Sequence, residues 1–297
     1  MLVSTFSDNF AKGSMELEIG ALVSELVLGH GYMHYGYFPK GLTEELSLQA
    51  LGQAQHAYFE KLLETIGTVP GEIRRILDVG SGAGANAKGL IGAGFDVTCV
   101  SPSTQMNEMA RANLPNGTRV IDSSFEDLAT NARYDLRLFA ESFHYMELKS
   151  ALTQVEKYAD IGVVIFDYFH RDAANSDARD GKRSTHAAFL EAVARQERFE
   201  VLVDKDVTAA ITPTFMILEN LKSEKLAPFV RRFRAILKQR HPLRAKVFEA
   251  VFGRSMDKLG PKPEKLASMD KRVCRSERFA QSHEYRLIAM CRKPATT

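Results

Sequence analysis

An aspartate and three glycines lie close together in the first third of the chain, in a spacing suited to a cofactor that carries a nucleoside. Residues Ile73 to Val79 predict a buried strand, and Gly80-Ser81-Gly82-Ala83-Gly84 follow it directly. Glycines let the backbone approach a ligand closely, and the helix expected after them offers unpaired N–H groups. The Asp78 carboxylate would repel a phosphate and attract an ammonium group. The pattern therefore favours S-adenosylmethionine over a dinucleotide, with Asp78, Gly80, Ser81, Gly82 and Gly84 as contacts.

The end of the second predicted strand supports the same cofactor. Residues Phe95 to Val100 form a short apolar run, and Ser101-Pro102-Ser103 come after it. A nicotinamide enzyme usually has Asp or Glu at this place to bind the ribose. The glycine spacing alone also fits the dinucleotide fingerprint, and most methyltransferases carry an acid here too. The Ser-Pro turn favours S-adenosylmethionine through the family resemblance described below.

Three titratable side chains could remove a proton from a methyl acceptor. Transfer from a sulfonium needs the nucleophile, methyl group and sulfur to be aligned without water, and it requires no metal. A protonated amine, a hydroxyl or an acidic carbon must also lose a proton. The candidates are His34, Glu141 and His144, and His144 is favoured over His34 because it follows a predicted strand at the ligand-binding edge of a sheet. No metal site is expected, because the spacing of the polar residues from Asp167 to Asp172 fits an ordinary loop after a strand better.

An aromatic segment precedes the first strand. Residues 32–39 read Tyr-Met-His-Tyr-Gly-Tyr-Phe-Pro, and aromatic faces attract a sulfonium cation without competing as nucleophiles. The family resemblance described next implies that Tyr35 and Tyr37 close over the cofactor. Packing beneath a helical cover is the alternative role for this segment.

These segments, taken in order, resemble class I S-adenosylmethionine-dependent methyltransferases. The similar branch includes cyclopropane fatty-acyl phospholipid synthases and tocopherol-type methyltransferases. The resembling segments are Val97 to Gln105, with its Ser-Pro turn, the His-Tyr-Gly-Tyr segment, Ser124 to Leu128, and Ala140-Glu141-Ser142-Phe143-His144-Tyr145-Met146. The resemblance covers roughly residues 25 to 215 and is more specific than any single motif.

The resemblance also implies further cofactor contacts. Ser124, Phe125 and Glu126 would lie in the adenine-contacting loop, although the family more often has Asp in place of Ser124. The remaining implied contacts are Ser101, Gln105 and Ala140.

Strand and helix patterns alternate along most of the chain, as in a parallel sheet covered on both faces. The expected strands are Ile73–Val79, Phe95–Val100, Arg119–Asp122, Leu136–Ala140, Val163–Asp167, Phe199–Asp204 and Tyr285–Arg292. We expect helices over Leu17–Leu28 and Leu46–Ile66. The predicted fold is a Rossmann-like α/β methyltransferase sheet with a helical lid. Its predicted parts are an N-terminal helical cover (1–70), a cofactor-binding core (71–207 and 283–297) and the lid (208–282).

The predicted lid contains an amphipathic helix. Its apolar residues at helical spacing are Leu218, Leu221, Leu226, Phe229, Phe233, Ile236 and Leu237, and its basic residues are Arg231, Arg232, Arg234, Lys238 and Arg240. A solvated basic face is the plainer interpretation, and contact with an acidic or phospholipid substrate is the alternative. Residues Asp206 to Phe215 resemble the segment by which tocopherol-type and alkaloid-type relatives enter the lid, which implies that they line the substrate entrance. An ordinary strand-to-helix link, with Thr212 or Thr214 capping the next helix, is the alternative. Lys258 to Glu264 are expected to form a loop.

Composition narrows the class of partner. The chain has 39 Lys and Arg against 37 Asp and Glu, so no excess charge points to nucleic acid. Its three unpaired cysteines and the lack of a signal-peptide or membrane-span pattern suggest a cytoplasmic protein with a small-molecule substrate. The sequence does not decide whether the chain forms a homo-oligomer.

The sequence thus predicts methyl transfer from S-adenosylmethionine to a small or moderately apolar metabolite. Two alternatives remain. The same fold could act as a lyase or cyclase, in which a nucleophile within S-adenosylmethionine attacks the carbon chain of the same molecule and methylthioadenosine is released. The chain could also be a non-catalytic cofactor-binding module.

Overall fold

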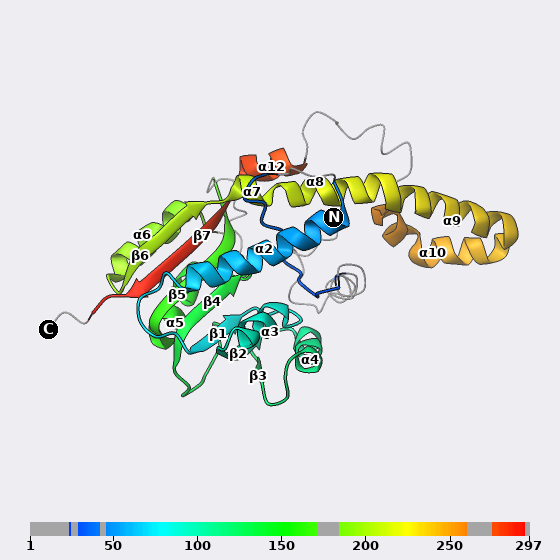
Figure 1. Ribbon diagram of the computed structural model, residues 1–297. Coiled ribbons are helices and arrows are strands. Elements are labelled where there is room, and N and C mark those ends of the chain that lie inside the picture. Colours follow the sequence, from blue (N-terminus) through cyan, green and yellow to red (C-terminus); the bar gives the residue numbers. More distant parts are fainter. Residues whose placement is uncertain (1–23, 25–28, 42–45, 172–183, 260–274, 295–297) are drawn as a thin grey trace.

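A seven-stranded sheet in the order β3-β2-β1-β4-β5-β7-β6 forms the centre of the molecule (Figure 1). The computed structural model describes residues 24, 29–41, 46–171, 184–259 and 275–294. The strands are β1 (Arg75–Val79), β2 (Asp96–Ser101), β3 (Arg119–Asp122), β4 (Tyr134–Ala140), β5 (Ala159–His170), β6 (Phe199–Asp206) and β7 (His283–Arg292). The first five strands are parallel, whereas β7 is antiparallel to both β5 and β6. The predicted fold is confirmed, with each strand within a few residues of its expected place.

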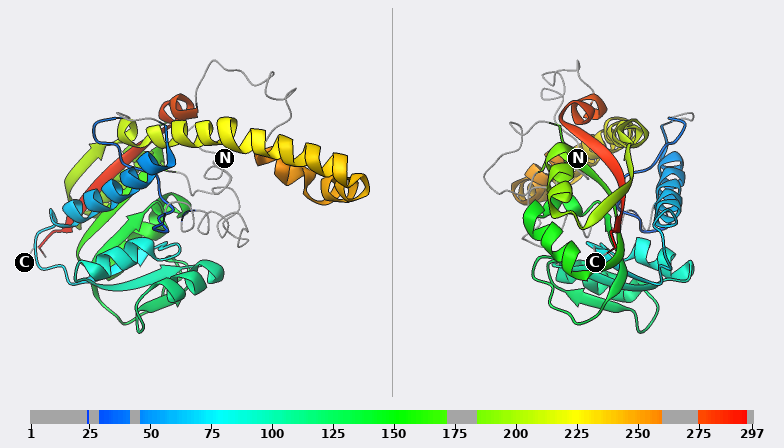
Figure 2. Two further views of the ribbon diagram at one scale, coloured as in Figure 1. Left: turned by 45° about the vertical axis from the view of Figure 1, so that its right-hand side comes forward. Right: turned by 90° about the vertical axis from the view of Figure 1, so that its left-hand side faces the viewer.

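Helices cover both faces of the sheet (Figure 2). On one face lie α2 (Leu48–Ile66), α3 (Ala85–Gly92) and α4 (Thr104–Asn113); α5 (Leu148–Tyr158) and α6 (His186–Gln196) lie on the other. In β5, Val164 and Phe166 pack on the α2 side, whereas Val163 and Ile165 pack on the α5 side. This double burial explains why the parallel strands read as continuous apolar runs.

Short polar side chains set where several helices begin. The Ser47 hydroxyl accepts a hydrogen bond from Ala50 N at 3.1 Å, so α2 begins at Leu48 rather than Leu46. Ser103 and Thr185 cap α4 and α6 in the same way. The expected helix over Leu17–Leu28 lies outside the described residues except for Ser24.

The aromatic segment is held between the N-terminal helix and the C-terminal helical region. Tyr37 N donates to Ala54 O on α2 at 2.8 Å, and Gly36 N donates to Thr214 Oγ1 at 2.9 Å. Thr214 lies on α8 (Pro213–Asn220), which follows the short helix α7 (Thr208–Ile211). Two regions far apart in sequence are therefore joined beside the sheet.

Beyond α8 the chain continues as a long helical rod (Figure 1). A π-helix (Leu221–Leu226) leads into α9 (Ala227–Arg240), and α10 (Pro242–Leu259) returns beside α9 before α12 (Arg275–Ser282). We call residues 227–259 the projecting arm, because they extend away from the sheet in both figures. No helix in the described part of the chain is both long and apolar enough to cross a bilayer.

The projecting arm exposes apolar side chains and corrects one expectation. Phe229 is 63% exposed and Ile236 is 56% exposed. Lys258 and Leu259, expected in a loop, belong to α10, and the rest of that expected loop lies outside the described residues.

Candidate functional site

The glycine turn after β1 adopts a backbone conformation that side chains disfavour. Gly80, Gly82 and Gly84 have φ values of +73°, +55° and +86°. A Cβ atom on Gly80 would collide with the Ser142 side chain, which comes from the loop after β4. Gly80 N also donates to Val100 O at 2.8 Å, so the ends of β1 and β2 are held together. The turn presents the start of α3 at the carboxyl edge of the sheet.

Asp78 lies at the end of β1 with only 1% of its surface exposed. Among the residues that the structure describes, its Oδ2 atom is buried without a hydrogen-bond partner. Burial raises the pKa of this carboxyl to about 7. An unpartnered buried carboxylate next to an open glycine turn fits a ligand that brings a positive charge.

The polar end of β2 is already hydrogen-bonded. The Ser101 hydroxyl accepts from Ser103 N at 3.2 Å, and Ser101 O accepts from the Asn107 amide at 2.8 Å. The Asn107 amide also donates to Asp122 Oδ1, at the end of β3. Gln105 is exposed on the first turn of α4. Sequence reasoning missed Asp122, an acid close to the place where β2 lacks one.

The predicted adenine loop contains both exposed and buried side chains. Ser124 caps its own loop, accepting from Asp127 N at 3.1 Å and donating to Asp127 Oδ2 at 2.7 Å. The Phe125 ring is buried and packs edge-on against Phe139, with 5.3 Å between centroids. Any ligand contact by Phe125 would therefore use its backbone. Glu126 is partly exposed, and its carbonyl accepts from the Gln154 amide.

His144 and Asp167 form a hydrogen-bonded pair at the same edge of the sheet. His144 belongs to a short 3₁₀ helix (Phe143–Tyr145) after β4, and its Nδ1 lies 2.7 Å from Asp167 Oδ1. Asp167 is fully buried and also accepts from Phe143 N at 2.7 Å and Tyr168 N at 2.7 Å. These bonds orient the imidazole so that Nδ1 donates and Nε2 is the nitrogen able to accept a proton.

Asp167 was not singled out as a partner for His144 from the sequence. Asp167 to His170 were expected in a polar loop after a strand. They lie within β5 instead, and residues beyond Arg171 in that loop lie outside the described range. An Asp-His pair separated by 23 residues becomes visible only when β4 and β5 are placed side by side.

Glu141 is partly buried, and its carboxyl is held from two directions. It accepts from Tyr35 N at 2.7 Å and from the Tyr285 hydroxyl at 2.7 Å. Burial raises the pKa of this carboxyl to about 8. Its backbone has a φ of +56°, a strained value for a residue other than glycine. The structure therefore fixes the Glu141 carboxyl next to the aromatic segment.

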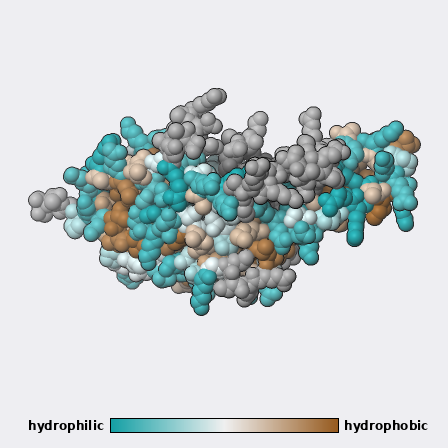
Figure 3. Space-filling model, turned by 90° about the horizontal axis from the view of Figure 1, so that it is seen from above, coloured by the Kyte–Doolittle hydropathy of each residue, from teal (hydrophilic) through white to brown (hydrophobic). Residues whose placement is uncertain are grey.

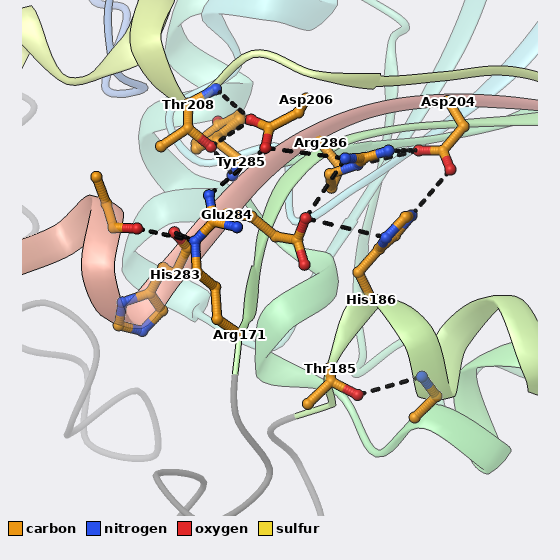
Figure 4. Close-up of polar contacts among 12 residues, drawn as sticks. Arg171, Thr185, His186, Asp204, Asp206, Thr208, His283, Glu284, Tyr285 and Arg286 are labelled. Atoms are coloured by element: carbon orange, nitrogen blue, oxygen red, sulfur yellow. Dashed lines mark hydrogen bonds and ion pairs between the residues drawn. The ribbon is translucent and has the colours of Figure 1, made fainter.

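An ionic network fixes the strand that carries Tyr285 (Figure 4). The Arg286 guanidinium contacts Asp204 Oδ1 at 2.5 Å, and Tyr285 N donates to Thr208 Oγ1 at 2.8 Å. His186 of α6 lies 3.0 Å from Asp204 on the other side. These contacts join β6, β7 and α7, and so hold the Tyr285 hydroxyl toward Glu141.

His34 is placed differently from the other two candidate bases. Its ring is 6% exposed and stacks on Tyr58 with 3.9 Å between centroids, and Nδ1 donates to Tyr35 O at 2.8 Å. Burial lowers the pKa of His34 to about 4. This arrangement suits a neutral packing residue better than a base, although its role in the reaction stays a prediction.

The two preferred aromatic residues differ in burial. Tyr35 is 7% exposed and packs against Phe215 of α8 at 5.0 Å between centroids. Tyr37 is partly exposed and packs edge-on against Phe166 at 6.1 Å. Ala140, the last residue of β4, is also partly exposed and precedes Glu141. The structure thus brings Tyr35, Ala140, Glu141 and His144 to the carboxyl edge of the sheet near Asp78 and the glycine turn.

Comparisons with known proteins agree with this arrangement. A family model described as a methyltransferase domain matches residues 76–162, which include β1, the glycine turn and His144. Over residues 76–162 this chain is similar to a methyltransferase domain, and its fold is that of S-adenosylmethionine-dependent methyltransferases. An uncharacterized methyltransferase of Mycobacterium bovis is 29% identical over 89 residues, and one of Oceanobacillus iheyensis is 27% identical over 120 residues.

The curated relatives match only part of this chain. The aligned segments span 30% and 37% of the chain, and 37% and 56% of the two relatives' own lengths. The similarity to these relatives is therefore evidence about part of the chain only, and not about the whole of it.

Solved structures resemble nearly the whole chain in fold. Geranyl diphosphate C-methyltransferase from Streptomyces coelicolor A3(2), in complex with Mg²⁺, geranyl-S-thiolodiphosphate and S-adenosyl-L-homocysteine, gives a TM-score of 0.63 at 14% identity. The match covers 98% of each chain. The [4+2]-cyclase SpnF gives a TM-score of 0.58 at 17% identity, covering 94% of this chain and 97% of that one. Similarity at these identities is a similarity of fold.

Proposed function

We propose that this protein transfers a methyl group from S-adenosylmethionine to a small, moderately apolar metabolite that loses a proton. The observation that carries the proposal is the His144–Asp167 pair, which lies at the same sheet edge as the glycine turn and the unpartnered Asp78 carboxylate. A cofactor-binding turn and an oriented base are the two parts that such a reaction needs.

The residues at this edge fit the cofactor. Asp78 would face its ammonium group, and the backbone of Gly80 to Gly84 would lie against it closely. Tyr35 and Tyr37 would lie near the sulfonium, which supplies the activated methyl carbon when the cofactor is bound. The remaining proposed contacts are Ser81, Ser101, Gln105, Ser124, Phe125, Glu126 and Ala140. The solved geranyl diphosphate C-methyltransferase contains S-adenosyl-L-homocysteine, a related ligand.

His144 is the proposed general base. With the cofactor bound, His144 Nε2 would take the proton that the acceptor loses as it receives the methyl group. The Asp167 carboxylate stabilises the imidazolium through Nδ1–H and keeps the ring from rotating. Histidine normally returns such a proton to solvent near neutral pH.

Glu141 is the proposed positioning residue. Its hydrogen bond from Tyr35 N ties the aromatic segment to the end of β4, and its bond from Tyr285 ties it to β7. Because burial keeps this carboxyl largely protonated near neutral pH, it is suited to hold the segment rather than to take a proton.

The proposal also includes the kind of acceptor and the cellular compartment. Many aromatic rings surround the edge, including Tyr168, Phe215 and Phe279, which suits an apolar natural-product acceptor. Two buried free cysteines, Cys99 and Cys291, fit a reducing cytoplasm.

The sulfur-containing product tests the proposal. The full chain is incubated with S-adenosylmethionine alone and then with fractions of a metabolite extract. We expect S-adenosylhomocysteine to accumulate only with an acceptor fraction, and His144→Gln to prevent it. Formation of methylthioadenosine without an acceptor would contradict methyl transfer and indicate lyase or cyclase chemistry instead. Cofactor binding without either product would support a non-catalytic module.

A further inference from the structure

The projecting arm is a self-contained helical hairpin. Arg234 of α9 forms an ion pair with Glu249 of α10 at 2.8 Å and donates to Gly253 O at 3.1 Å. Phe233 and Phe248 meet between the two helices with 5.6 Å between centroids. These contacts keep α9 and α10 together where they extend away from the sheet (Figures 1 and 2).

The arm exposes an unusual amount of apolar surface. Six of the eight large hydrophobic side chains found exposed in the described part of the chain lie on it. They are Phe229 at 63%, Phe233 at 36%, Ile236 at 56%, Leu243 at 77%, Val247 at 65% and Phe252 at 52%. Brown apolar patches lie beside teal hydrophilic surface at the outer end of the arm (Figure 3). Clustered exposed apolar side chains mark a surface that contacts something.

The arm is also strongly basic. Residues 227–259 contain nine Lys and Arg and two Asp and Glu, a net charge of +7. The other 264 residues contain 30 Lys and Arg and 35 Asp and Glu, a net charge of −5. The near-neutral total therefore conceals a basic arm attached to an acidic body.

We propose that the projecting arm docks on an anionic lipid surface. A helix with exposed Phe, Ile and Leu beside Arg and Lys can bury the apolar side chains at the headgroup boundary while the cations meet lipid phosphates. A second copy of the arm fits less well, because two arms of net charge +7 would repel each other and the cores of protein interfaces are poor in charge. Projection from the body leaves the arm accessible to a flat surface.

Exposed positions on the arm allow substitutions that should spare the fold. Leu243 and Val247 are the most exposed of its hydrophobic side chains, and Arg240 and Arg244 beside them are exposed as well. A matched control pair, one apolar and one basic residue, lies on β6 outside the arm. Its members are Leu202, which is 37% exposed, and the exposed Lys205.

Vesicle sedimentation with the full chain tests the proposal independently of any reaction. Vesicles of phosphatidylcholine alone are compared with vesicles in which about a third of the lipid is phosphatidylglycerol. We expect binding to the anionic vesicles only, weaker binding at high salt, and at least about a tenfold loss for Leu243→Ser/Val247→Ser and for Arg240→Gln/Arg244→Gln. The control Leu202→Ser/Lys205→Gln should bind like the parent, and circular dichroism should show all variants folded.

Three results would overturn the proposal. The first is no sedimentation with anionic vesicles, and the second is binding that the arm variants leave unchanged. The third is a doubled mass in sedimentation velocity that the arm variants abolish without any vesicle binding, which would make the arm a contact between copies of this chain.

Discussion

Asp78 shows how a single buried residue can prepare a site for a charged ligand. Its carboxyl is almost fully buried, one oxygen lacks a partner within the described residues, and burial raises its pKa to about 7. An ammonium group placed beside it would restore the charged form. Cofactor binding should therefore be coupled to loss of a proton from Asp78.

This coupling predicts how S-adenosylmethionine affinity depends on pH. Below about pH 7 the free protein holds Asp78 protonated, so binding must release that proton and affinity should fall by up to about tenfold per pH unit. Calorimetry in buffers of different ionisation enthalpy measures both the affinity and the proton released. Asp78→Asn should bind weakly and without this dependence, whereas the exposed control Asp96→Asn should behave like the parent. A parent affinity that is flat from pH 5.5 to 7 would contradict the role of Asp78.

The His144–Asp167 pair makes a separate prediction about turnover. His144→Gln removes the base, and Asp167→Asn removes the charge that stabilises the imidazolium. Each should lower kcat by about 10²- to 10⁴-fold while leaving S-adenosylmethionine affinity nearly unchanged.

The exposed His241→Gln is the matched control for this pair. If His144→Gln were as active as the parent, the contact between His144 and Asp167 would be purely structural.

At the scale of elements, the aromatic segment connects three elements that lie far apart in the sequence. It bonds to α2 through Ala54, to α8 through Thr214 and to the end of β4 through Glu141. The segment therefore takes its conformation from its neighbours, because it has no helix or strand of its own.

Thr214→Val should expose this dependence. The substitution keeps the shape of a side chain that is 2% exposed but leaves Gly36 N without its acceptor, at a cost of about 1–3 kcal/mol in the free energy of unfolding. Urea unfolding measures this loss, and S-adenosylmethionine affinity should weaken as well because the segment loosens.

On the exposed side of α5, Thr153→Val removes a hydroxyl without leaving a buried donor and should cost less than about 0.5 kcal/mol. If both variants were equally stable, the segment would not depend on α8.

What the sequence could predict at this scale depended on how local the signal was. The strands and the glycine turn are encoded by neighbouring residues, so β1 and Gly80 to Gly84 could be located from their spacing. Asp167 and Tyr285 could not be assigned, because each reaches its partner only through strand pairing, and Tyr285 lies 144 residues from Glu141. The surroundings of the arm could not be predicted either, because a helical apolar stripe does not say whether it faces a core or solvent.

At the scale of the whole molecule, two buried carboxyls make stability depend on pH. The pKa of Asp78 is raised to about 7 and that of Glu141 to about 8, both above their ordinary values. The folded protein thus holds protons that the unfolded chain releases. Their contribution to the free energy of unfolding is complete below about pH 4 and is lost as pH rises through 7 and 8.

Comparison of the parent with Asp78→Asn/Glu141→Gln isolates this effect. The double variant should gain stability relative to the parent as pH rises from about 5 to about 8, by on the order of several kcal/mol across that range. Urea unfolding at a series of pH values measures the difference. A constant difference would show that neither carboxyl takes up a proton on folding.

The helical region between β6 and β7 leaves and re-enters the sheet at almost the same point. Asp206 at the end of β6 pairs with Arg286 near the start of β7. Because the two strands are hydrogen-bonded neighbours, everything between them is topologically the loop of a hairpin, and its length places no demand on the register of the sheet. Evolution could therefore lengthen, shorten or exchange the arm while the nucleotide-binding core stayed intact, and a protein engineer could graft it onto a related core at the same two positions.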